Sequence, residues 1–299
     1  MERSQRLQKA QDFIWCNGRL IERYLFTFLF ANGSKESVLA ALRAYQNEDG
    51  GIGNALEPDK RCPSSQPQDI EIALHILDAI NAMDDPMLER ACDYLATITT
   101  SEGGVPYALP SVNAYPHAVW WTVEDNPPAS LNPTAAIAGL LLKHGIQHPW
   151  IEAASQFCWR EIAATDATEF HTLMPIITFL EHVSDRARAE HELQRIAAHL
   201  SQPGVIELDP HAEGYVQKPL NWAPTPQSFC RRLFDNETIE KHLTTLANRQ
   251  QGDGGWPISW DPISPAVAIE WRGRITIEIL RTLDAYEGER TSLLSLHNA

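Results

Sequence analysis

Acidic and aromatic residues gather in a few stretches of this chain, and these residue types can donate protons and bind apolar or cationic groups. A buried carboxylic acid can keep its proton and deliver it to a substrate, and aromatic faces attract cations through their quadrupoles. The candidate catalytic carboxyls are Glu57, Asp59, Asp261 and Glu270. The candidate substrate-binding residues are Arg61, Tyr115, His117, Trp120, Trp121, Trp222, Trp256, Trp260, Trp271 and Arg272.

The spacing of apolar residues predicts helices to position these side chains, because it repeats every three and four residues. Twelve helices are expected, in two alternating sets. The more polar set is expected at 4–16, 36–46, 86–98, 149–162, 186–200 and 237–249, and the more apolar set at 19–31, 68–82, 132–144, 168–183, 225–234 and 266–286. A helix that is apolar on most sides belongs inside, and one with a single apolar stripe belongs outside.

This alternation predicts an all-α fold, an α/α toroid of six inner and six outer helices around a central cavity. One domain is expected to span residues 1–299. The connections from outer to inner helices are long, at 47–67, 99–131, 201–224 and 250–265, and those from inner to outer helices are short. All the long loops should therefore lie at one end of the scaffold, which is where functional loops usually gather.

Most of the candidate site residues lie in these long loops or at the start of an inner helix. When a ring closes, its first loop and its last inner helix become neighbours. We therefore expect Glu57 and Asp59 to approach Arg272 in one cavity, where Arg272 either pairs with a carboxylate or faces a pocket. Glu270 and Arg272 interrupt an apolar helix, and an unpaired buried charge is costly.

Two glycine turns in the chain repeat each other. They read Gln46-Asn-Glu-Asp49-Gly50-Gly51-Ile52 and Gln250-Gln-Gly-Asp253-Gly254-Gly255-Trp256, with weaker copies at Ser101-Glu-Gly103-Gly104 and Ser201-Gln-Pro-Gly204. A turn that recurs in this way indicates a repeat architecture. We interpret the glycines as residues that allow a turn that a Cβ would obstruct, and the glutamine amides as caps for the next helix.

The spacing of Gln250, Gly254 and Trp256 resembles the QW motif of squalene-hopene and oxidosqualene cyclases. The Asp-Gly-Gly turns are also similar to those of protein prenyltransferase β subunits. This resemblance to the terpenoid cyclase and protein prenyltransferase superfamily implies a short, single-domain α/α toroid. It also implies an enzyme, either a terpenoid cyclase-like lyase or isomerase or a prenyltransferase, that acts on or binds an isoprenoid or other hydrophobic small molecule in a Trp-lined cavity.

The catalytic motifs of that superfamily match less well. The chain has no Asp-x-Asp-Asp motif, and the segment nearest to it in character, Ser130-Leu-Asn-Pro-Thr134-Ala135, has no carboxylate. Asp84-Asp85-Pro-Met-Leu-Glu89 fits a loose magnesium-binding pattern, but acids at the start of a helix are also ordinary caps. We therefore expect no metal site and no cofactor, with Mg²⁺ only if the substrate is a diphosphate.

Two alternatives to the isoprenoid function stay open, because a fold alone does not determine a function. The first is a carbohydrate-active α/α-barrel enzyme, a glycoside hydrolase or epimerase, in which two carboxyls act as acid and base and tryptophans stack on sugars. The second is a non-catalytic binding protein that uses the same pocket.

Composition limits the partners. The net charge of −15 argues against nucleic acid, because phosphate binding needs a basic face. No apolar run approaches the roughly 18 residues that span a bilayer, and the first residues lack the apolar core of a signal peptide. The five scattered cysteines are expected to be reduced thiols, so we expect a cytoplasmic protein.

Overall fold

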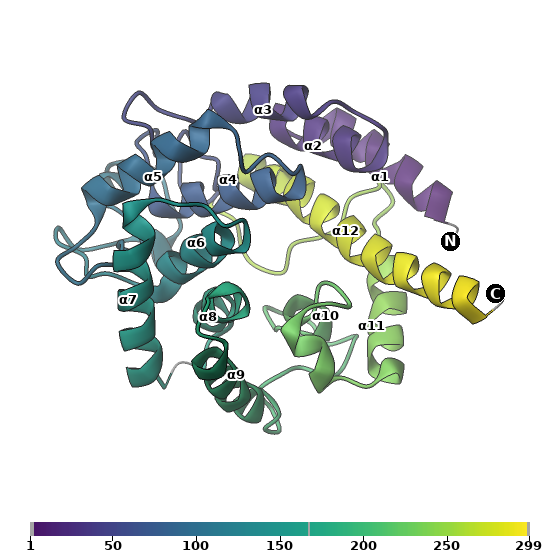
Figure 1. The fold of residues 1–299 in the computed structure, drawn as a ribbon. Helices are drawn as coiled ribbons and strands as arrows, with labels where there is room; N and C mark the ends of the chain where they lie inside the picture. The colour runs from purple at the N-terminus through teal and green to yellow at the C-terminus, as the bar shows by residue number, and fades with distance from the viewer. Residues whose placement is uncertain (1–2, 167, 298–299) are drawn as a thin grey trace. The chain divides into compact units, whose positions relative to one another are not determined.

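The computed structural model describes residues 3–166 and 168–297, and within them the chain is helical, with isolated β-bridges and no named strand (Figure 1). The chain divides into two compact units. The terminal unit comprises residues 1–31 and 197–299, and the middle unit comprises residues 32–196. The all-α prediction is confirmed for the described residues, and the single domain over 1–299 stays a prediction.

The middle unit has two layers of helices. One layer contains α4 (Pro67–Ala79), α6 (Leu131–Lys143) and α8 (Phe170–His182), with α6 packed against both of the others. The second layer contains α5 (Pro86–Ile98) and α7 (Pro149–Ala164), and α7 packs on α6 and α8. The predicted alternation of apolar inner helices with outer helices is therefore present in this unit, which begins with α3 (Lys35–Arg43). Helix α9 (Arg186–Leu200) crosses the boundary between the units.

Helices α6 and α8 pack closely because α6 is apolar and has a glycine at the contact. Helix α6 is buried without interruption from Pro133 to Leu141, as its nearly continuous apolar sequence predicts. Gly139 allows the helices to approach, because a Cβ at this position would lie 2.6 Å from the carbonyl oxygen of Thr178 in α8. Two features thus stabilise the packing of α6 on α8. These are the burial of apolar side chains and the close approach of the two backbones at Gly139.

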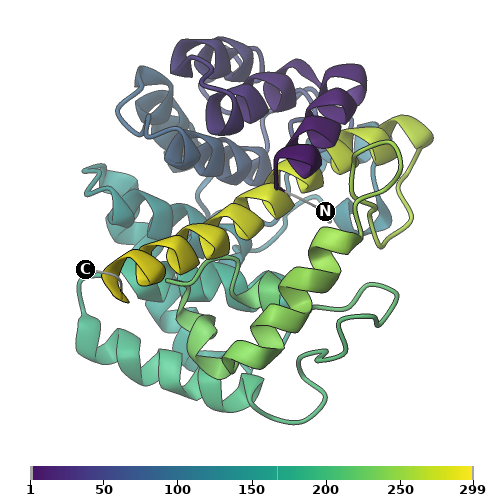
Figure 2. The same ribbon diagram turned by 90° about the vertical axis from the view of Figure 1, so that its right-hand side faces the viewer.

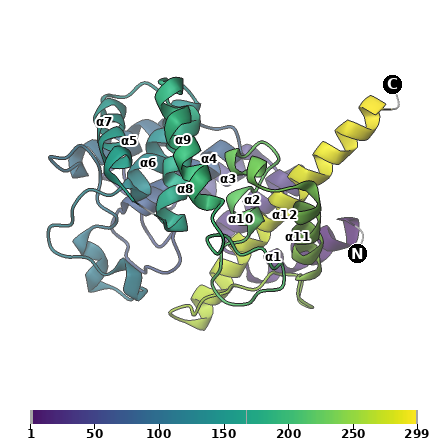
Figure 3. The ribbon, with the colours of Figure 1, turned by 90° about the horizontal axis from the view of Figure 1, so that it is seen from below.

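The terminal unit joins the two ends of the chain (Figure 2). Helix α12 (Pro265–His297) packs against α1 (Arg3–Asn17), α2 (Leu20–Phe30) and α11 (Asn236–Asn248) (Figure 3). Arg6 is buried and pairs with Glu287 at 2.5 Å. The first and last helices of the chain therefore lie side by side in this unit.

One predicted helix is wrong. The inner helix expected at 225–234 is replaced by the short α10 (Pro219–Trp222) and a 3-10 turn, η3 (Phe229–Leu233). Pro224 and Pro226 lie at the start of the expected helix, where proline is tolerated. The segment instead forms a local turn, in which the Thr225 amide donates to the Ser228 hydroxyl at 3.1 Å. A second difference is that α12 continues to His297, beyond the expected end at residue 286.

The repeated glycine turns bind outer helices. The side-chain amide of Gln46 donates to the carbonyls of Gly50, at 2.8 Å, and of Met87 in α5, at 2.9 Å. The amide of Gln250 donates in the same way to Gly254, at 2.8 Å, and to Arg6 in α1, at 2.9 Å. These bonds link each turn to the carbonyls of a distant helix, which differs from the predicted capping of the next helix.

Valine at Gly50 or Gly254 is expected to lower the free energy of unfolding by about 1–3 kcal/mol. Both glycines have positive φ, at 89° and 96°. A Cβ would also lie 2.6 Å from the Arg90 carbonyl oxygen at Gly50, and 2.0 Å from that of Lys9 at Gly254. Urea unfolding measures the loss.

Gly252 provides the control for this experiment, because it lies in the same turn as Gly254 and a Cβ there would have no heavy atom within 4 Å. Gly252→Val is expected to stay within about 0.5 kcal/mol of the wild type. Equal unfolding curves for all three variants would contradict the structural role of the turns.

Candidate functional site

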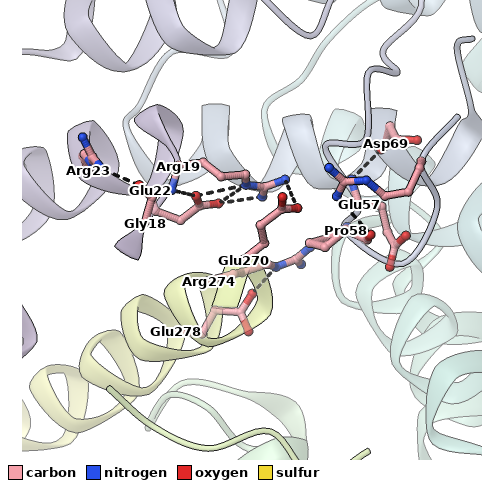
Figure 4. Close-up of polar contacts among 11 residues, drawn as sticks. Gly18, Arg19, Glu22, Arg23, Glu57, Pro58, Asp69, Glu270, Arg274 and Glu278 are labelled. Carbon is pink, nitrogen blue, oxygen red and sulfur yellow. Dashed lines mark hydrogen bonds and ion pairs between the residues drawn. The ribbon is translucent and has the colours of Figure 1, made fainter. Parts of the chain in front are cut away.

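Three carboxyl side chains are buried near one buried lysine in the middle unit. Glu57 and Asp59, in the loop before α4, are 4% and 1% exposed. Asp69, in the first turn of α4, and Lys60 are each 1% exposed. The Lys60 ammonium lies 2.6 Å from one Asp69 oxygen. The Glu57 amide donates to the other Asp69 oxygen at 2.6 Å (Figure 4). We call these four residues the buried acid cluster.

The loop that carries this cluster is paired with the second long loop. Lys60 and His117 form an isolated antiparallel bridge. The Ala118 amide donates to the Asp59 carbonyl at 2.8 Å, and the Arg61 amide donates to Pro116 at 2.9 Å. These two long loops therefore meet, as predicted. Their backbone hydrogen bonds hold the backbone of Asp59 against the second loop.

A column of side chains extends from the cluster. The Lys60 ammonium lies 4.8 Å from the centre of the Trp121 ring, and Trp121 stacks on Tyr107 at 4.7 Å. Trp121 is buried, whereas its neighbour Trp120 is exposed. A cation over a buried indole is favourable because the ring face is electron-rich, so Trp121 supports the lysine that neutralises Asp69.

His117 is held by its own loop. One ring nitrogen lies 2.6 Å from the Tyr115 carbonyl and the other lies 3.0 Å from the Thr122 hydroxyl. The Tyr115 side chain itself is exposed. The Arg61 guanidinium contacts the carbonyl of Pro58 at 3.4 Å.

The terminal unit contains an aromatic group of its own. Trp260 and Trp271 meet edge to face, with their ring centres 5.1 Å apart, and Tyr215 contacts Trp260 at 5.9 Å. The Arg274 guanidinium lies 5.3 Å from the Trp271 ring and bonds to Glu278 at 2.7 Å (Figure 4). Two tryptophans that the sequence selected are therefore in contact.

Glu270 and Arg272, the two charges in the last inner helix, have separate partners. Glu270 lies 3.7 Å from Arg19, which also binds Glu22 at 2.6 Å (Figure 4). Arg272 bonds to Asp253 at 2.8 Å and to the Trp256 carbonyl at 3.1 Å. A hydrogen bond from Arg272 is the main cause that lowers the pKa of Asp253. Arg272 therefore binds the glycine turn, through a carboxylate other than the two that the sequence suggested.

The remaining candidates are spread between core and surface. Trp222 and Trp256 are buried in the terminal unit, and the Trp256 indole donates to the Leu246 carbonyl at 2.8 Å. Asp261 is exposed. The structure thus groups Asp59 with His117 and Trp121 in one unit, and Trp260 with Trp271 in the other. A single cavity that contains all the candidates stays a prediction.

Sequence reasoning missed Asp69 and Tyr107 as parts of the site. Asp69 carries a recognisable signal, since it is an acid in the first turn of an apolar helix that begins at Pro67. A charge in such a place needs a partner. Tyr107 carries no comparable signal, because its contact with Trp121 depends on the path of the loop.

The magnesium-like motif is a helix cap. The Asp85 carboxylate accepts from the Met87 amide at 3.0 Å and from Arg43 at 2.7 Å, which confirms the capping interpretation. In the part of the chain that the structure describes, no group of three or more His, Cys, Asp or Glu side chains is arranged to hold a metal ion. Magnesium bound with a diphosphate substrate stays a prediction.

No helix in the described residues has both the length and the apolar character needed to cross a bilayer.

Comparison with known proteins shows the fold. No family model and no curated protein matches the sequence. A protein from Actinoplanes has a similar structure, with a TM-score of 0.61 and 15% identity over 95% of this chain and 99% of that chain. Type II terpene cyclase MstE from Scytonema, in its apo form, has a TM-score of 0.57 and 15% identity, covering 94% and 97% of the two chains.

An MstE variant in complex with geranylgeranyl dihydroxybenzoate, its substrate, is also similar, with a TM-score of 0.53 and 14% identity over 94% of this chain and 97% of that chain. At such low identity the likeness is one of fold. The chain has the fold of these type II terpene cyclase structures, which agrees with the fold class that the sequence predicted.

Proposed function

We propose that this chain is a terpenoid cyclase that starts the cyclisation of an isoprenoid by protonating it, with Asp59 as the acid. The observation that supports this most is the buried acid cluster, in a chain that has the fold of type II terpene cyclases. The resemblance of the glycine turns to the QW motif points in the same direction.

The chemistry follows from burial. Removing a carboxyl from water disfavours its ionised form. Lys60 pairs with Asp69 at 2.6 Å, and Glu57 and Asp59 are buried in the same loop as this lysine. A carboxylic acid kept neutral in such a place can transfer its proton to an alkene. The electrons of the alkene form the new C–H bond and leave a carbocation, which further alkenes in the same substrate attack.

Asp59 is proposed ahead of Glu57 because its backbone is hydrogen-bonded to the second long loop. Its carbonyl accepts a bond from Ala118, and the next residue is bridged to His117. A proton donor must be held within hydrogen-bond reach of its substrate, and two paired loops hold it better than one. Glu57 is the alternative acid. Asp261 and Glu270, which lie in the terminal unit, stay proposed as catalytic residues.

The proposal is tested by incubating the purified chain with a panel of isoprenoids that includes prenylated benzoates, prenyl diphosphates and squalene-like polyenes. We expect a cyclic product with the mass of its substrate, identified by mass spectrometry. Hydrolysis or epimerisation of a glycan, with no conversion of any isoprenoid, would favour the carbohydrate alternative. Binding without conversion of any substrate would favour the binding protein.

A further inference from the structure

The proposed acid lies in a tight turn of the first long loop. The turn comprises residues 57–60, and the Lys60 amide donates to the Glu57 carbonyl at 3.4 Å. Pro58 and Asp59 are its two central residues. Proline suits the first central position because its φ is fixed near the value that such a turn needs. The turn fixes only its own shape, so the position of Asp59 depends on what holds the two ends of the turn.

Asp69 holds both ends. This residue lies in the first turn of α4, where the helix dipole favours a negative charge. One oxygen of its carboxylate accepts from the Glu57 amide at 2.6 Å (Figure 4). The other oxygen accepts from the Lys60 ammonium at 2.6 Å. Because all three residues are buried and the carboxylate is ionised, both contacts are strong. One side chain of α4 therefore joins the two ends of the turn that carries Asp59.

The start of α4 also holds the second long loop. Gln66, which precedes the helix and is 0% exposed, accepts from the Leu109 amide at 2.8 Å through its side-chain oxygen. The Ala118 amide of the same loop donates to the Asp59 carbonyl at 2.8 Å. Asp59 thus lies between two loops that are each bonded to the start of α4, and Asp69 supplies the direct link.

We propose that Asp69 is a positioning residue for Asp59, because its carboxylate fixes the turn that presents this acid. Both oxygens of Asp69 already accept hydrogen bonds from the loop, so its role is to hold the acid and not to contact the substrate. This inference rests on the proposed cyclase function. A reacting group displaced by about 1 Å can lose roughly 100-fold in rate, so kcat should depend on Asp69 while KM does not.

Two double variants separate positioning from stability. Lys60→Met/Asp69→Leu and Lys60→Met/Asp69→Asn both remove the buried ion pair, so neither leaves one partner of that pair alone. Only the second keeps a side-chain oxygen that can accept from the Glu57 amide. We expect kcat to fall by roughly 10- to 100-fold in the first variant, with KM unchanged, and to fall less in the second. Both variants lose the Lys60 cation, so the difference between them reports the contact with the Glu57 amide.

Asp85→Asn is the matched control. The Asp85 carboxylate also accepts from a backbone amide, that of Met87 in α5, and from a cation, Arg43 in α3. Its substitution is expected to lower the melting temperature and to leave kcat and KM unchanged. If kcat followed the melting temperature across all three variants, Asp69 would be a structural residue only, and the inference would be overturned.

Amide hydrogen exchange tests the position of the turn without turnover. The Ala118 amide donates to the Asp59 carbonyl, so its protection reports whether the two loops stay together. This amide is expected to exchange faster in Lys60→Met/Asp69→Leu than in the wild type, and at the wild-type rate in Asp85→Asn. Unchanged exchange at Ala118 in the first of these variants would also overturn the inference.

The outcomes separate this inference from the proposed function. A wild-type chain that cyclises no isoprenoid would refute the cyclase function, and faster exchange at Ala118 would then still show that Asp69 holds the loop. A cyclase that keeps the wild-type kcat in Lys60→Met/Asp69→Leu would refute the inference alone.

Discussion

Asp59→Asn is expected to lower kcat for cyclisation by roughly 10²- to 10⁴-fold, the usual contribution of a general acid. Asparagine has nearly the shape of aspartic acid but carries no proton that it can transfer to an alkene. The backbone bonds of residue 59 to the second long loop involve its carbonyl and are retained. The melting temperature should therefore stay close to that of the wild type while product formation falls.

Two variants serve as controls for this loss. Glu57→Gln makes the same chemical change at the other buried acid of the loop, and we expect it to retain more activity than Asp59→Asn. Asp125→Asn makes the change at an exposed carboxyl that is not a candidate site residue, and it is expected to reduce activity least. An Asp59→Asn enzyme as active as the wild type would contradict the assignment, and a larger loss in Glu57→Gln would transfer it to Glu57.

Lys60→Met is expected to lower the free energy of unfolding by about 3–5 kcal/mol, which is the usual cost of removing one partner of a buried ion pair. Lys60 and Asp69 are both 1% exposed and lie 2.6 Å apart, so the substitution leaves a buried carboxylate without this cation. It also removes the cation from the face of Trp121. Denaturation in urea measures the change.

The double variant Lys60→Met/Asp69→Leu is expected to recover much of this loss, because apolar replacements for a whole buried ion pair are often neutral. The amide of Glu57 then loses its acceptor, so recovery should be incomplete. Lys241→Met, which breaks an exposed pair with Glu237, is the control and should leave the unfolding curve close to that of the wild type. A similarly small cost for Lys60→Met would show that the pair does not stabilise the fold.

Much of the fold could be predicted from the sequence because apolar periodicity and helix caps are local signals. The expected ranges 86–98 and 186–200 coincide with α5 and α9. Asp85, whose side chain caps α5, marks the start of that helix. The range 225–234 was wrong because an apolar pattern was given more weight than local turn chemistry, in which the Thr225 amide donates to the Ser228 hydroxyl.

Less of the candidate site could be predicted, because its contacts join residues that lie far apart in the chain. The sequence identified Asp59 and His117 as candidates, but not that their two loops pair through backbone hydrogen bonds. It identified the Gln250 turn, but not that the amide of Gln250 reaches the carbonyl of Arg6. Such contacts depend on how loops pack, which periodicity does not encode. The meeting of Trp260 with Trp271 has the same origin.

The central claim is that cyclisation begins with a proton from the protein, and the most direct measurement is cyclisation in D₂O followed by mass spectrometry of the product. An acid that exchanges with solvent delivers deuterium, so a product that forms by gain of one proton and loss of another should be heavier by one mass unit. The same label should be absent when Asp59→Asn is used. An unlabelled cyclic product, formed with release of diphosphate, would contradict the account, because that reaction begins by ionisation of the substrate.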